Sequence, residues 1–541
     1  MDRLRYVLIA GITVVLYAGT SGDLVLRIRP DDPIWREPKP LDTGKLVPRK
    51  IDDAYDQLEK TFLLPGKPPE DGPARALGIN TLDEVPDSAW YTNRHGRRRM
   101  SIEELLSGPG NVRAPSRDGR WTILSAKSEG VTPGFVIRDE NGRRYMLKFD
   151  TPRAPNTTTA ADVIGSKIFY ALGYFTPENY PVTFRREQLQ VGDSALITDI
   201  TGATRRMTRY DVDTLLRSVY RREDGLYRGL ASLFVEGSLL GPWLYHGTRS
   251  DDPNDIYPHE RRRDVRGLYV FAAWLNHYDA TSLNTLDTLV QDQGRRFVRH
   301  FLIDFGSIMG SSGVGARDPR NGFVYQYDFG FAWKTAFTLG LYAPEWQRTQ
   351  YPDLPETGRF EAEAFDPLTW KPIYPNPAFI NCRPDDAYWA AKKVMAFTDE
   401  ELRRLVALGE FEDQRSAQHL TSILQQRRDK IGRTFFARVT PLDNFAVEGR
   451  ALVYEDLSQK YGFSKGGTVA SEWFAYKAPG ALADKLPGGG LRVPAALQGA
   501  PDGLIAVARL RLEGRPAAQK VDVYIRRGQG RWDVVGVSRS W

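Results

Sequence analysis

The sequence predicts an α+β protein with two lobes, an N-terminal extension and a small C-terminal β module. Short apolar runs separated by turn residues are typical of strands and dominate residues 116–245, whereas helical periodicity dominates residues 246–438. Strand patterns separated by glycines return beyond that point. With 541 residues and a hydrophobic fraction of 41%, the chain can bury a core in each part. The predicted organisation is an extension at 23–115, lobes at 116–245 and 246–438, and a β module at 439–541.

The first residues are typical of an export signal. Arg3 and Arg5 precede an apolar stretch from Tyr6 to Ala18, and small residues follow up to Gly22. The stretch is short for a spanning helix and fits a signal peptide. We therefore expect an exported protein, in the periplasm or at the outer face of the cytoplasmic membrane. If residues 1–22 stay attached, they would also provide membrane association through the N-terminus.

Composition excludes several classes of function. The net charge of +6 results from 74 basic and 68 acidic residues, and the basic run at 259–263 is balanced by nearby aspartates. A nucleic-acid footprint needs clustered, unneutralised charge, so we expect no nucleic-acid partner. The single cysteine, Cys382, excludes an internal disulfide and a cysteine-based metal cluster.

The extension at 23–115 is rich in Pro, Asp and Arg and is expected to wrap around the lobes rather than fold alone. One amphipathic helix is predicted within it, over "IDDAYDQLEKTF". Ala54, Leu58 and Phe62 recur there at i, i+4 and i+8, which places them on one face.

The first lobe is predicted to contain three strands, one helix and two further strands. The strands are expected in "WTILSAKSEG", "GFVIRDENG", "RRYMLKFD", "SALITDI" and "GLASLFVEGSLLGPWLY". Asn141-Gly142 is a strong hairpin signal because both residues accept positive φ. The helix is predicted over "TTTAADVIGSKIFYALGY", where threonines 157–159 can cap its start and Gly173 can end it.

The second lobe is predicted to be mostly helical. A helix over "DVRGLYVFAAWLNH" leads into a loop and a hairpin, and two amphipathic helices follow over "DDAYWAAKKVMAFTDEELRRLVAL" and "SAQHLTSILQQRRDKIGRTFF". The β module is predicted from "GLIAVARLRL", "KVDVYIRR" and "RWDVVGVS", with a hairpin tip at Gly528-Gln529-Gly530.

One constellation in the second lobe suggests phosphoryl transfer, which needs an acidic group on the acceptor hydroxyl and oxygen ligands for Mg²⁺. His277 and Asp279 are followed by Asn284, then by a predicted hairpin, and then by Asp304-Phe305-Gly306. This order resembles the H-x-D-x4-N loop and the D-F-G motif of protein kinases. The resemblance implies that Asp279 is the base, with His277 in the catalytic loop, and that Asn284 and Asp304 hold the metal ion.

The first lobe supplies a candidate cation for the phosphates. Lys148 lies in an apolar strand, where a lysine is costly unless it has a task or reaches solvent. It resembles the strand lysine of kinases, and Asp162 is the only carboxylate of the next helix. Asp162 has two interpretations, as the partner of Lys148 or as a helix cap with Thr159.

The segment "AKSEGVTPG" could cover a nucleotide, because the backbone at Gly130 and Gly134 can approach phosphates closely. A plain hairpin is the alternative interpretation. The overall resemblance covers roughly residues 120–435. The glycine-rich motif G-x-G-x-x-G of typical protein kinases is missing. The resemblance therefore points to atypical kinase-like families such as the HipA-type toxin kinases, the CotH-type spore-coat kinases and the phosphoinositide lipid kinases.

The chain departs from typical protein kinases at two loop positions. Tyr278 replaces an arginine, and Thr281 stands where protein kinases carry a lysine that steadies the γ-phosphate. A second D-F-G at Asp328 lies outside the predicted hairpin, where an aromatic-rich surface strand is the simpler interpretation.

Two functional hypotheses follow from the resemblance and its departures. The first is an exported kinase-like phosphotransferase that uses ATP and Mg²⁺ or Mn²⁺ on a hydroxyl of a protein, a glycan or a lipid. The alternative is a catalytically inactive kinase-like scaffold of the cell envelope, a pseudokinase. The complete set of Lys148, Asp279, Asn284 and Asp304 favours the enzyme, whereas the export signal and the missing loop lysine favour the scaffold.

Overall fold

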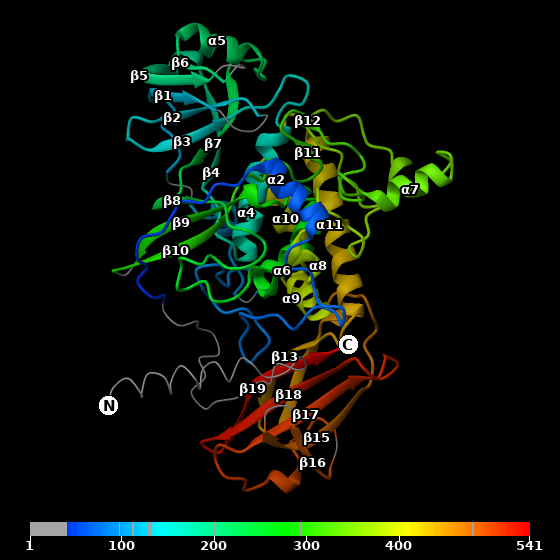
Figure 1. Ribbon diagram of the computed structural model, residues 1–541. Coiled ribbons are helices and arrows are strands. Elements are labelled where there is room, and N and C mark those ends of the chain that lie inside the picture. The colour runs from blue at the N-terminus through cyan, green and yellow to red at the C-terminus, as the bar shows by residue number, and fades with distance from the viewer. Residues whose placement is uncertain are drawn as a thin grey trace.

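The computed structural model describes residues 40–96, 98–110, 113–127, 132–198, 202–292, 294–478, 481–488 and 490–541. The predicted export segment at 1–22 and the loop residue Gly130 lie outside these ranges. Within them, none of the helices is long and apolar enough to cross a bilayer. The chain forms two α+β lobes, and a separate β module lies below the second lobe in Figure 1.

The first lobe is built on a seven-stranded sheet of order β4-β7-β3-β2-β1-β5-β6. Its strands are β1 (Trp121–Ala126), β2 (Gly134–Arg138), β3 (Arg144–Lys148), β4 (Asn179–Phe184), β5 (Leu189–Thr198), β6 (Thr204–Arg206) and β7 (Tyr227–Leu233). The hairpin of β2 and β3 turns at the predicted place, where Gly142 has a φ of +78°. Alternating residues such as Phe135, Ile137 and Leu147 form the core of this lobe.

Helix α4 (Thr157–Leu172) connects the two lobes. It contacts β4 and β7 of the first lobe, and it ends at Gly173 as predicted. Its apolar residues Ile164, Ile168 and Leu172, however, belong to the large core of the second lobe. Because nearly every residue of α4 is buried, the helix fixes the position of one lobe relative to the other.

The second lobe contains a three-stranded sheet and a helical core. Strands β9 (Thr285–Asp292) and β10 (Arg295–Leu302) form the predicted hairpin, and β8 (Ser238–Gly241) pairs with β9. The β8 strand was expected in the first lobe, but its pairing places it in the second. The helices are α6 (Arg263–Leu275), α8 (Pro377–Ile380), α9 (Pro384–Met395), α10 (Asp399–Ala407) and α11 (Gln414–Ala437).

Two further elements differ from the predictions. The segment expected as one helix at 385–408 forms two, because Thr398 accepts a hydrogen bond from Glu401 N–H and so caps a new helix, α10. Helix α5 (Arg209–Arg217) was not predicted, although Thr208 and Asp211 form a capping box at its start. In both cases a local cap starts a helix that apolar periodicity alone does not indicate.

The aromatic segment at 321–327, before the second D-F-G, forms turns instead of the predicted surface strand, and a helix begins directly after Asp328. Asp328 accepts a hydrogen bond from Phe331 N–H at 3.0 Å and caps α7 (Phe329–Phe337). The carboxylate also forms an ion pair with Lys371 at 2.6 Å. The short helix projects from the second lobe at the right of Figure 1.

The N-terminal extension forms a helix where one was predicted, but its buried face is the opposite one. Helix α2 (Asp53–Leu58) continues into the π-helix η1 (Glu59–Leu63), and both Leu58 and Phe62 are exposed. The buried residues are Asp56 and Lys60, which form an ion pair at 2.8 Å. Asp56 also accepts a hydrogen bond from Tyr374 Oη at 2.7 Å, so polar contacts hold this helix on the second lobe.

The C-terminal module contains two antiparallel sheets. One pairs β13 (Leu442–Glu448) with β14 (Ala451–Asp456), and the other has the order β16-β15-β17-β18-β19. The strands of the larger sheet are β15 (Val469–Ala478), β16 (Ala481–Lys485), β17 (Ile505–Leu512), β18 (Lys520–Gly528) and β19 (Arg531–Ser540). Its last strand contacts the extension, because Val537 N–H donates to Thr81 O at 2.8 Å.

Candidate active site

Lys148 lies between two carboxylates at the boundary of the lobes. It is the last residue of β3, and its Nζ atom is 2.9 Å from Asp162 Oδ2 of α4 and 2.9 Å from Asp304 Oδ1. The side chains of Lys148 and Asp162 are buried, whereas that of Asp304 is about half exposed. A buried lysine is therefore explained by charge pairing, and one of its two partners remains accessible to a ligand.

Between its two interpretations, Asp162 takes the role of lysine partner. Its second oxygen, Oδ1, accepts hydrogen bonds from Asn179 Nδ2 at 2.9 Å and from Phe305 N–H at 3.1 Å. The start of α4 is capped by a different carboxylate, Asp150, which accepts from the N–H groups of residues 158 and 159 at 2.8 and 3.1 Å. Asp162 is thus free of capping and joins the helix to both Lys148 and the D-F-G motif.

The three charges shift each other's pKa values. Burial alone would lower the pKa of Lys148, but the carboxylates of Asp162 and Asp304 raise it above its ordinary value. Burial raises the pKa of Asp162, and Lys148 only partly opposes this. For Asp304 the positive charge of Lys148 outweighs burial and lowers the pKa. Lys148 and Asp304 are therefore both ionised at neutral pH, as phosphate and metal binding require.

The predicted catalytic loop is held against the strand that leads to Asp304. Helix α6 ends at Asn276, which has a left-handed φ of 50°. Further along, Asn284 Nδ2 donates to Asp279 O at 2.7 Å, and Ile303 N–H donates to Asn284 O at 3.0 Å. These two bonds fix the distance between the candidate base and the D-F-G motif. Asn284 uses its amide NH₂ group internally, so Oδ1 is the atom that would bind a metal ion.

The carboxylate of Asp279 contacts two residues that follow the D-F-G motif. Ser307 Oγ donates to Asp279 Oδ2 at 3.4 Å, and the Arg317 guanidinium lies 3.6 Å from the same oxygen. Arg317 also covers the ring of Tyr278 at 5.3 Å. The structure thus places a cation beside the candidate base, although Thr281 stands at the loop position of the kinase lysine. Sequence spacing gave no signal for Arg317, because the chain returns to the loop through irregular segments.

His277 belongs to an aromatic cluster rather than to the charged group. Its buried ring lies 6.2 Å from Phe305 and 5.8 Å from Phe169, and these two rings stack at 5.0 Å. Burial, followed by the positive charge of Arg317, lowers the pKa of His277 to about 4. Gly165 allows this stack, because a Cβ atom there would lie 2.6 Å from Phe305 Cβ. This packing favours a positioning role for His277 over proton transfer.

The glycine loop predicted to cover a nucleotide is described only in part, because Gly130 lies outside the described residues. Gly134 pairs with Lys148, and a Cβ atom there would lie 2.2 Å from Leu147 O, so strand packing by itself requires a glycine. Lys127, at the start of the loop, donates to Thr132 O at 3.1 Å, and its charge helps to lower the pKa of Asp304. Lys127 is a second cation near the site that sequence reasoning missed.

The side chains fit a Mg²⁺ or Mn²⁺ ion that is held jointly with phosphates. In the described part of the chain, His, Cys, Asp and Glu do not gather in any group of three that could hold a metal alone. Mg²⁺ typically takes one or two protein oxygens and completes its shell with phosphate oxygens and water. The half-exposed carboxylate of Asp304 and the amide oxygen of Asn284 match such a partial donor set.

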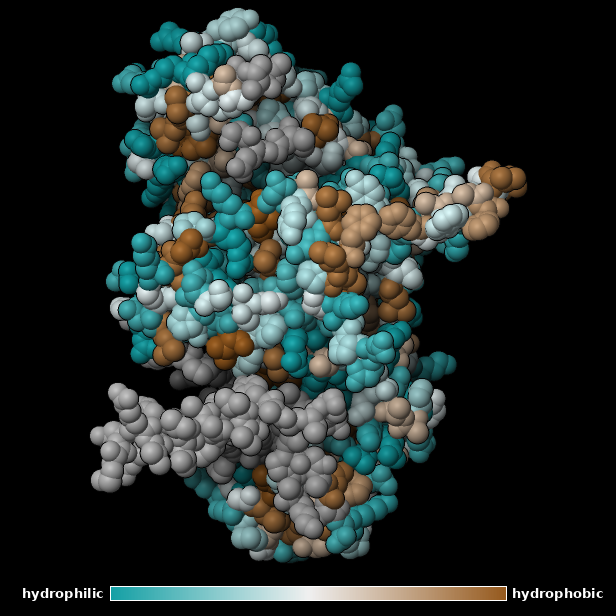
Figure 2. Space-filling view, in the orientation of Figure 1, coloured by the Kyte–Doolittle hydropathy of each residue, from teal (hydrophilic) through white to brown (hydrophobic). Residues whose placement is uncertain are grey.

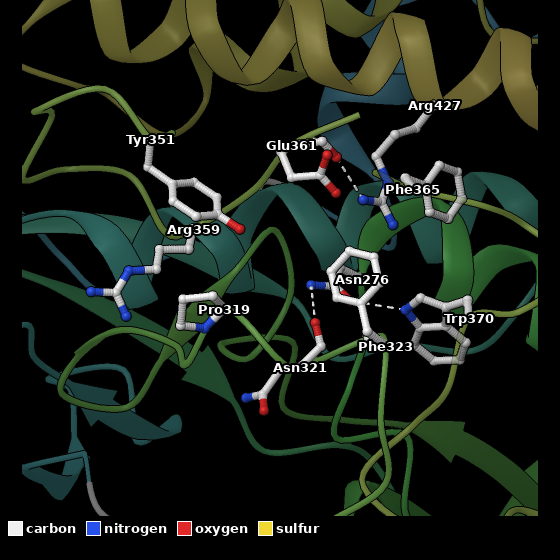
Figure 3. A pocket seen from close by; sticks show the side chains of 11 residues that line it. Asn276, Pro319, Asn321, Phe323, Tyr351, Arg359, Glu361, Phe365, Trp370 and Arg427 are labelled. Atoms are coloured by element: carbon white, nitrogen blue, oxygen red, sulfur yellow. Dashed lines mark hydrogen bonds between the residues drawn. The ribbon is translucent and has the colours of Figure 1, made fainter. Parts of the chain in front are cut away.

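A pocket next to the candidate catalytic loop is lined by residues that bond to the end of α6 and to Asn276. It encloses about 260 Å³, including space open to solvent, and Figure 3 shows Arg427, Trp370 and Asn276 in its wall. Arg427 donates to the carbonyls of Ala273 at 2.6 Å and Trp274 at 2.9 Å. Trp370 Nε1 donates to Asn276 Oδ1 at 2.8 Å. The carbonyl groups in the last turn of a helix lack partners within the helix, and Arg427 provides partners for two of them. The residues that line this pocket therefore fix the position of the loop that follows α6.

Comparison with known proteins adds little to this geometry. No protein-family model matches the chain, and no curated protein matches it. Among solved structures, a Golgi casein kinase with Mn/ADP bound is similar over 62% of this chain and 74% of that chain, with a TM-score of 0.30 and 8% identity. A likeness this weak does not identify the chain. The order of strand lysine, helix carboxylate, loop aspartate, hairpin and D-F-G nevertheless matches the kinase arrangement, and it rests on the elements and contacts of this chain alone.

Proposed function

We propose that the protein is an atypical kinase-like phosphotransferase that transfers phosphate from ATP, with Mg²⁺ or Mn²⁺, to a hydroxyl group of a protein, a glycan or a lipid. The observation that carries the proposal is the position of Lys148, which bridges Asp162 and Asp304 at 2.9 Å each. Export, inferred from residues 1–22, is part of the same proposal and places the reaction in the periplasm or at the outer face of the cytoplasmic membrane.

Each residue has a separate role in this reaction. Lys148 binds a phosphate oxygen of the nucleotide, and Asp162 holds the ammonium group in place. Asp304 and Asn284 would hold the metal ion, which supplies positive charge to the phosphate oxygens when bound. Asp279 orients the acceptor hydroxyl and takes its proton, and the neighbouring Arg317 can offer positive charge to the transferred phosphoryl group.

The contact between Arg317 and Asp279 also supports the second candidate, an inactive scaffold. In a scaffold, Arg317 at 3.6 Å would keep an acceptor hydroxyl away from Asp279 Oδ2. In that case nucleotide binding would persist without phosphoryl transfer. The two candidates differ only in turnover, so binding and transfer must be measured separately.

Nucleotide binding is tested by a thermal shift of the purified protein with ATP and MgCl₂. Saturation at about 100 times Kd corresponds to a stabilisation of about 2.7 kcal/mol, which raises the melting temperature. Lys148→Met should abolish the shift. Lys371→Met is the matched control, because Lys371 also forms an ion pair with the aspartate of a D-F-G sequence. An unchanged shift in Lys148→Met would reject the nucleotide site.

Turnover is tested by release of ADP and by transfer of the γ-phosphate to protein, glycan and lipid fractions of the envelope. The enzyme proposal expects transfer that is lost in Asp279→Asn while the ATP-induced thermal shift remains, because the base acts on the acceptor only. Binding without any transfer would instead support the scaffold.

A further inference from the structure

A set of apolar side chains is exposed on the projecting helix α7 and the turn after it. Phe329, Trp333 and Phe337 follow each other at i, i+4 and i+8 on one side of the helix, and Leu339 and Leu341 lie in the turn. Their exposed fractions are 58%, 63%, 82%, 90% and 87%. We call these five residues the apolar arm, and Figure 2 shows hydrophobic colour along it to its tip.

The opposite side of α7 is the one that packs against the protein. Phe331 contacts Tyr342 and Trp346, with ring centroids 6.2 and 6.0 Å apart. The side of α7 that packs on neighbouring residues is therefore a different side from the one that carries the apolar arm. Both sides of α7 carry aromatic residues. On the arm side, Phe329 contacts Phe62 at 6.0 Å, whereas Trp333 and Phe337 stack on each other at 5.6 Å.

The exposed surface continues onto the N-terminal extension. Phe62 of η1 lies 6.0 Å from Phe329, and its neighbours Leu58 and Leu63 are exposed. The extension lies beside the loop that carries the candidate base. Tyr374 Oη donates to Asp56 of α2 at 2.7 Å, and the N–H of the preceding residue, Ile373, donates to Tyr278 O at 2.8 Å. The apolar surface thus begins near the candidate active site and runs outward to the tip of the arm.

The charge and shape of the arm are those of an element that enters a lipid interface. From Phe329 to Pro344 the sequence contains one charged residue, Lys334, and no carboxylate. Lys334 is exposed and lies over the ring of Tyr342 at 5.1 Å, the ring that Phe331 also contacts. Helices that bind at membrane surfaces combine Trp, Phe and Leu on one face with Lys on the other. The arm also projects as a convex feature in Figure 1, which suits insertion into a soft layer.

We propose that the apolar arm inserts into the boundary between headgroups and acyl chains of a lipid bilayer. Insertion would remove these five side chains from water, which explains why an exposed apolar surface of this size is retained. The proposal does not depend on residues 1–22 and gives the protein a second, independent membrane contact. If the proposed function also holds, this contact brings the surface beside Asp279 close to acceptors located at the bilayer.

The test uses the full chain with Cys382→Ser, which removes the single cysteine, and Leu341→Cys, which carries an environment-sensitive fluorophore. Vesicles of phosphatidylcholine, alone or with phosphatidylglycerol, should shift the emission to the blue, and nitroxide-labelled lipids should quench it. A fluorophore at Tyr210→Cys, an exposed site on the first lobe, should not respond. Adding Trp333→Glu and Phe337→Glu should abolish the shift at position 341, whereas Ile256→Glu should leave it unchanged.

Three results would overturn the proposal. The first is that vesicles leave the emission at position 341 unchanged. The second is that the emission is already shifted without vesicles at every protein concentration, which would mean that another segment of the chain covers the arm. The third is a shift without vesicles that grows with protein concentration, which would mean that a second copy covers it. The ATP-induced thermal shift measured on the same sample reports separately on the proposed function.

Discussion

The guanidinium of Arg317 lies 3.6 Å from the carboxylate of Asp279, the candidate base. Arg317 is held there by its Nε atom, which donates to Ser311 O at 2.8 Å, and by the ring of Tyr278 beneath it. In the proposed reaction, the arginine would therefore act on the transferred phosphoryl group without large movement. The same contact could also keep Asp279 from an acceptor hydroxyl. The change in rate on removing the arginine therefore distinguishes an active site from an inhibited one.

If the site is active, Arg317→Ala should lower kcat by about 10²–10³-fold. The variant lacks one preorganised donor to the charge that develops on the phosphoryl group in the transition state. The KM for ATP should change little, since Lys148 remains. Arg317→Lys should recover part of the rate, and Arg320→Ala is the control for a nearby arginine that is half exposed. A rate that rises in Arg317→Ala would show that the arginine restrains Asp279.

The two D-F-G aspartates should respond differently to the same substitution. Asp304→Asn removes the negative charge that a metal ion needs, so it should abolish the Mg²⁺-dependent part of the ATP-induced thermal shift. Asp328→Asn should leave that part unchanged, because Asp328 caps α7 and pairs with Lys371. Melting curves with ATP, with and without Mg²⁺, measure both. If only Asp328→Asn lost the Mg²⁺-dependent part of the shift, the metal site would be at the start of α7 instead.

The contacts of Lys148 with Asp162 and Asp304 in the candidate site were predictable from the order of strand, helix and hairpin along the chain. Lys148 ends an apolar strand, and the hairpin of β9 and β10 returns the chain to Asp304 by simple strand pairing. Arg317 and Lys127 were not predictable, because irregular loops bring them to the site. The buried face of α2 was predicted wrongly, since apolar periodicity favoured Leu58 and Phe62 whereas the ion pair of Asp56 and Lys60 decides which side is buried.

The neutral state of His277 should make stability depend on pH. Its folded pKa of about 4 lies below the ordinary 6.5, so the unfolded chain binds more protons between these values. The stabilisation is complete above about pH 6.5 and is lost as the pH falls towards 4, by about 3 kcal/mol in total. His277→Phe keeps a ring beside the stacked pair of Phe169 and Phe305 but cannot titrate. Denaturant unfolding measured from pH 7 to pH 4 should therefore show a smaller decrease in the free energy of unfolding for the variant. Equal decreases in the variant and the wild type would contradict the lowered pKa of His277.

Arg263 should contribute most strongly to the stability of the second lobe. Its guanidinium is fully buried at the start of α6 and bonds to three carboxylates: Asp83 of the extension at 2.7 Å, Asp385 at 2.8 Å and Asp386 at 3.0 Å. These bonds join the extension, α6 and α9. Replacing the arginine by an apolar side chain leaves several buried negative charges without their main counter-charge.

We therefore expect Arg263→Met to lower the free energy of unfolding by about 3–5 kcal/mol, the usual cost of breaking a buried ion pair on one side. Arg403→Met is the matched control, because Arg403 pairs with Glu400 at 2.7 Å on the surface. Its loss should cost less than about 1 kcal/mol. Urea unfolding followed by tryptophan fluorescence compares the two variants at pH 7. Equal losses for Arg263→Met and Arg403→Met would show that the three carboxylates reorganise or take up protons, and that the arginine does not hold the extension to the lobe.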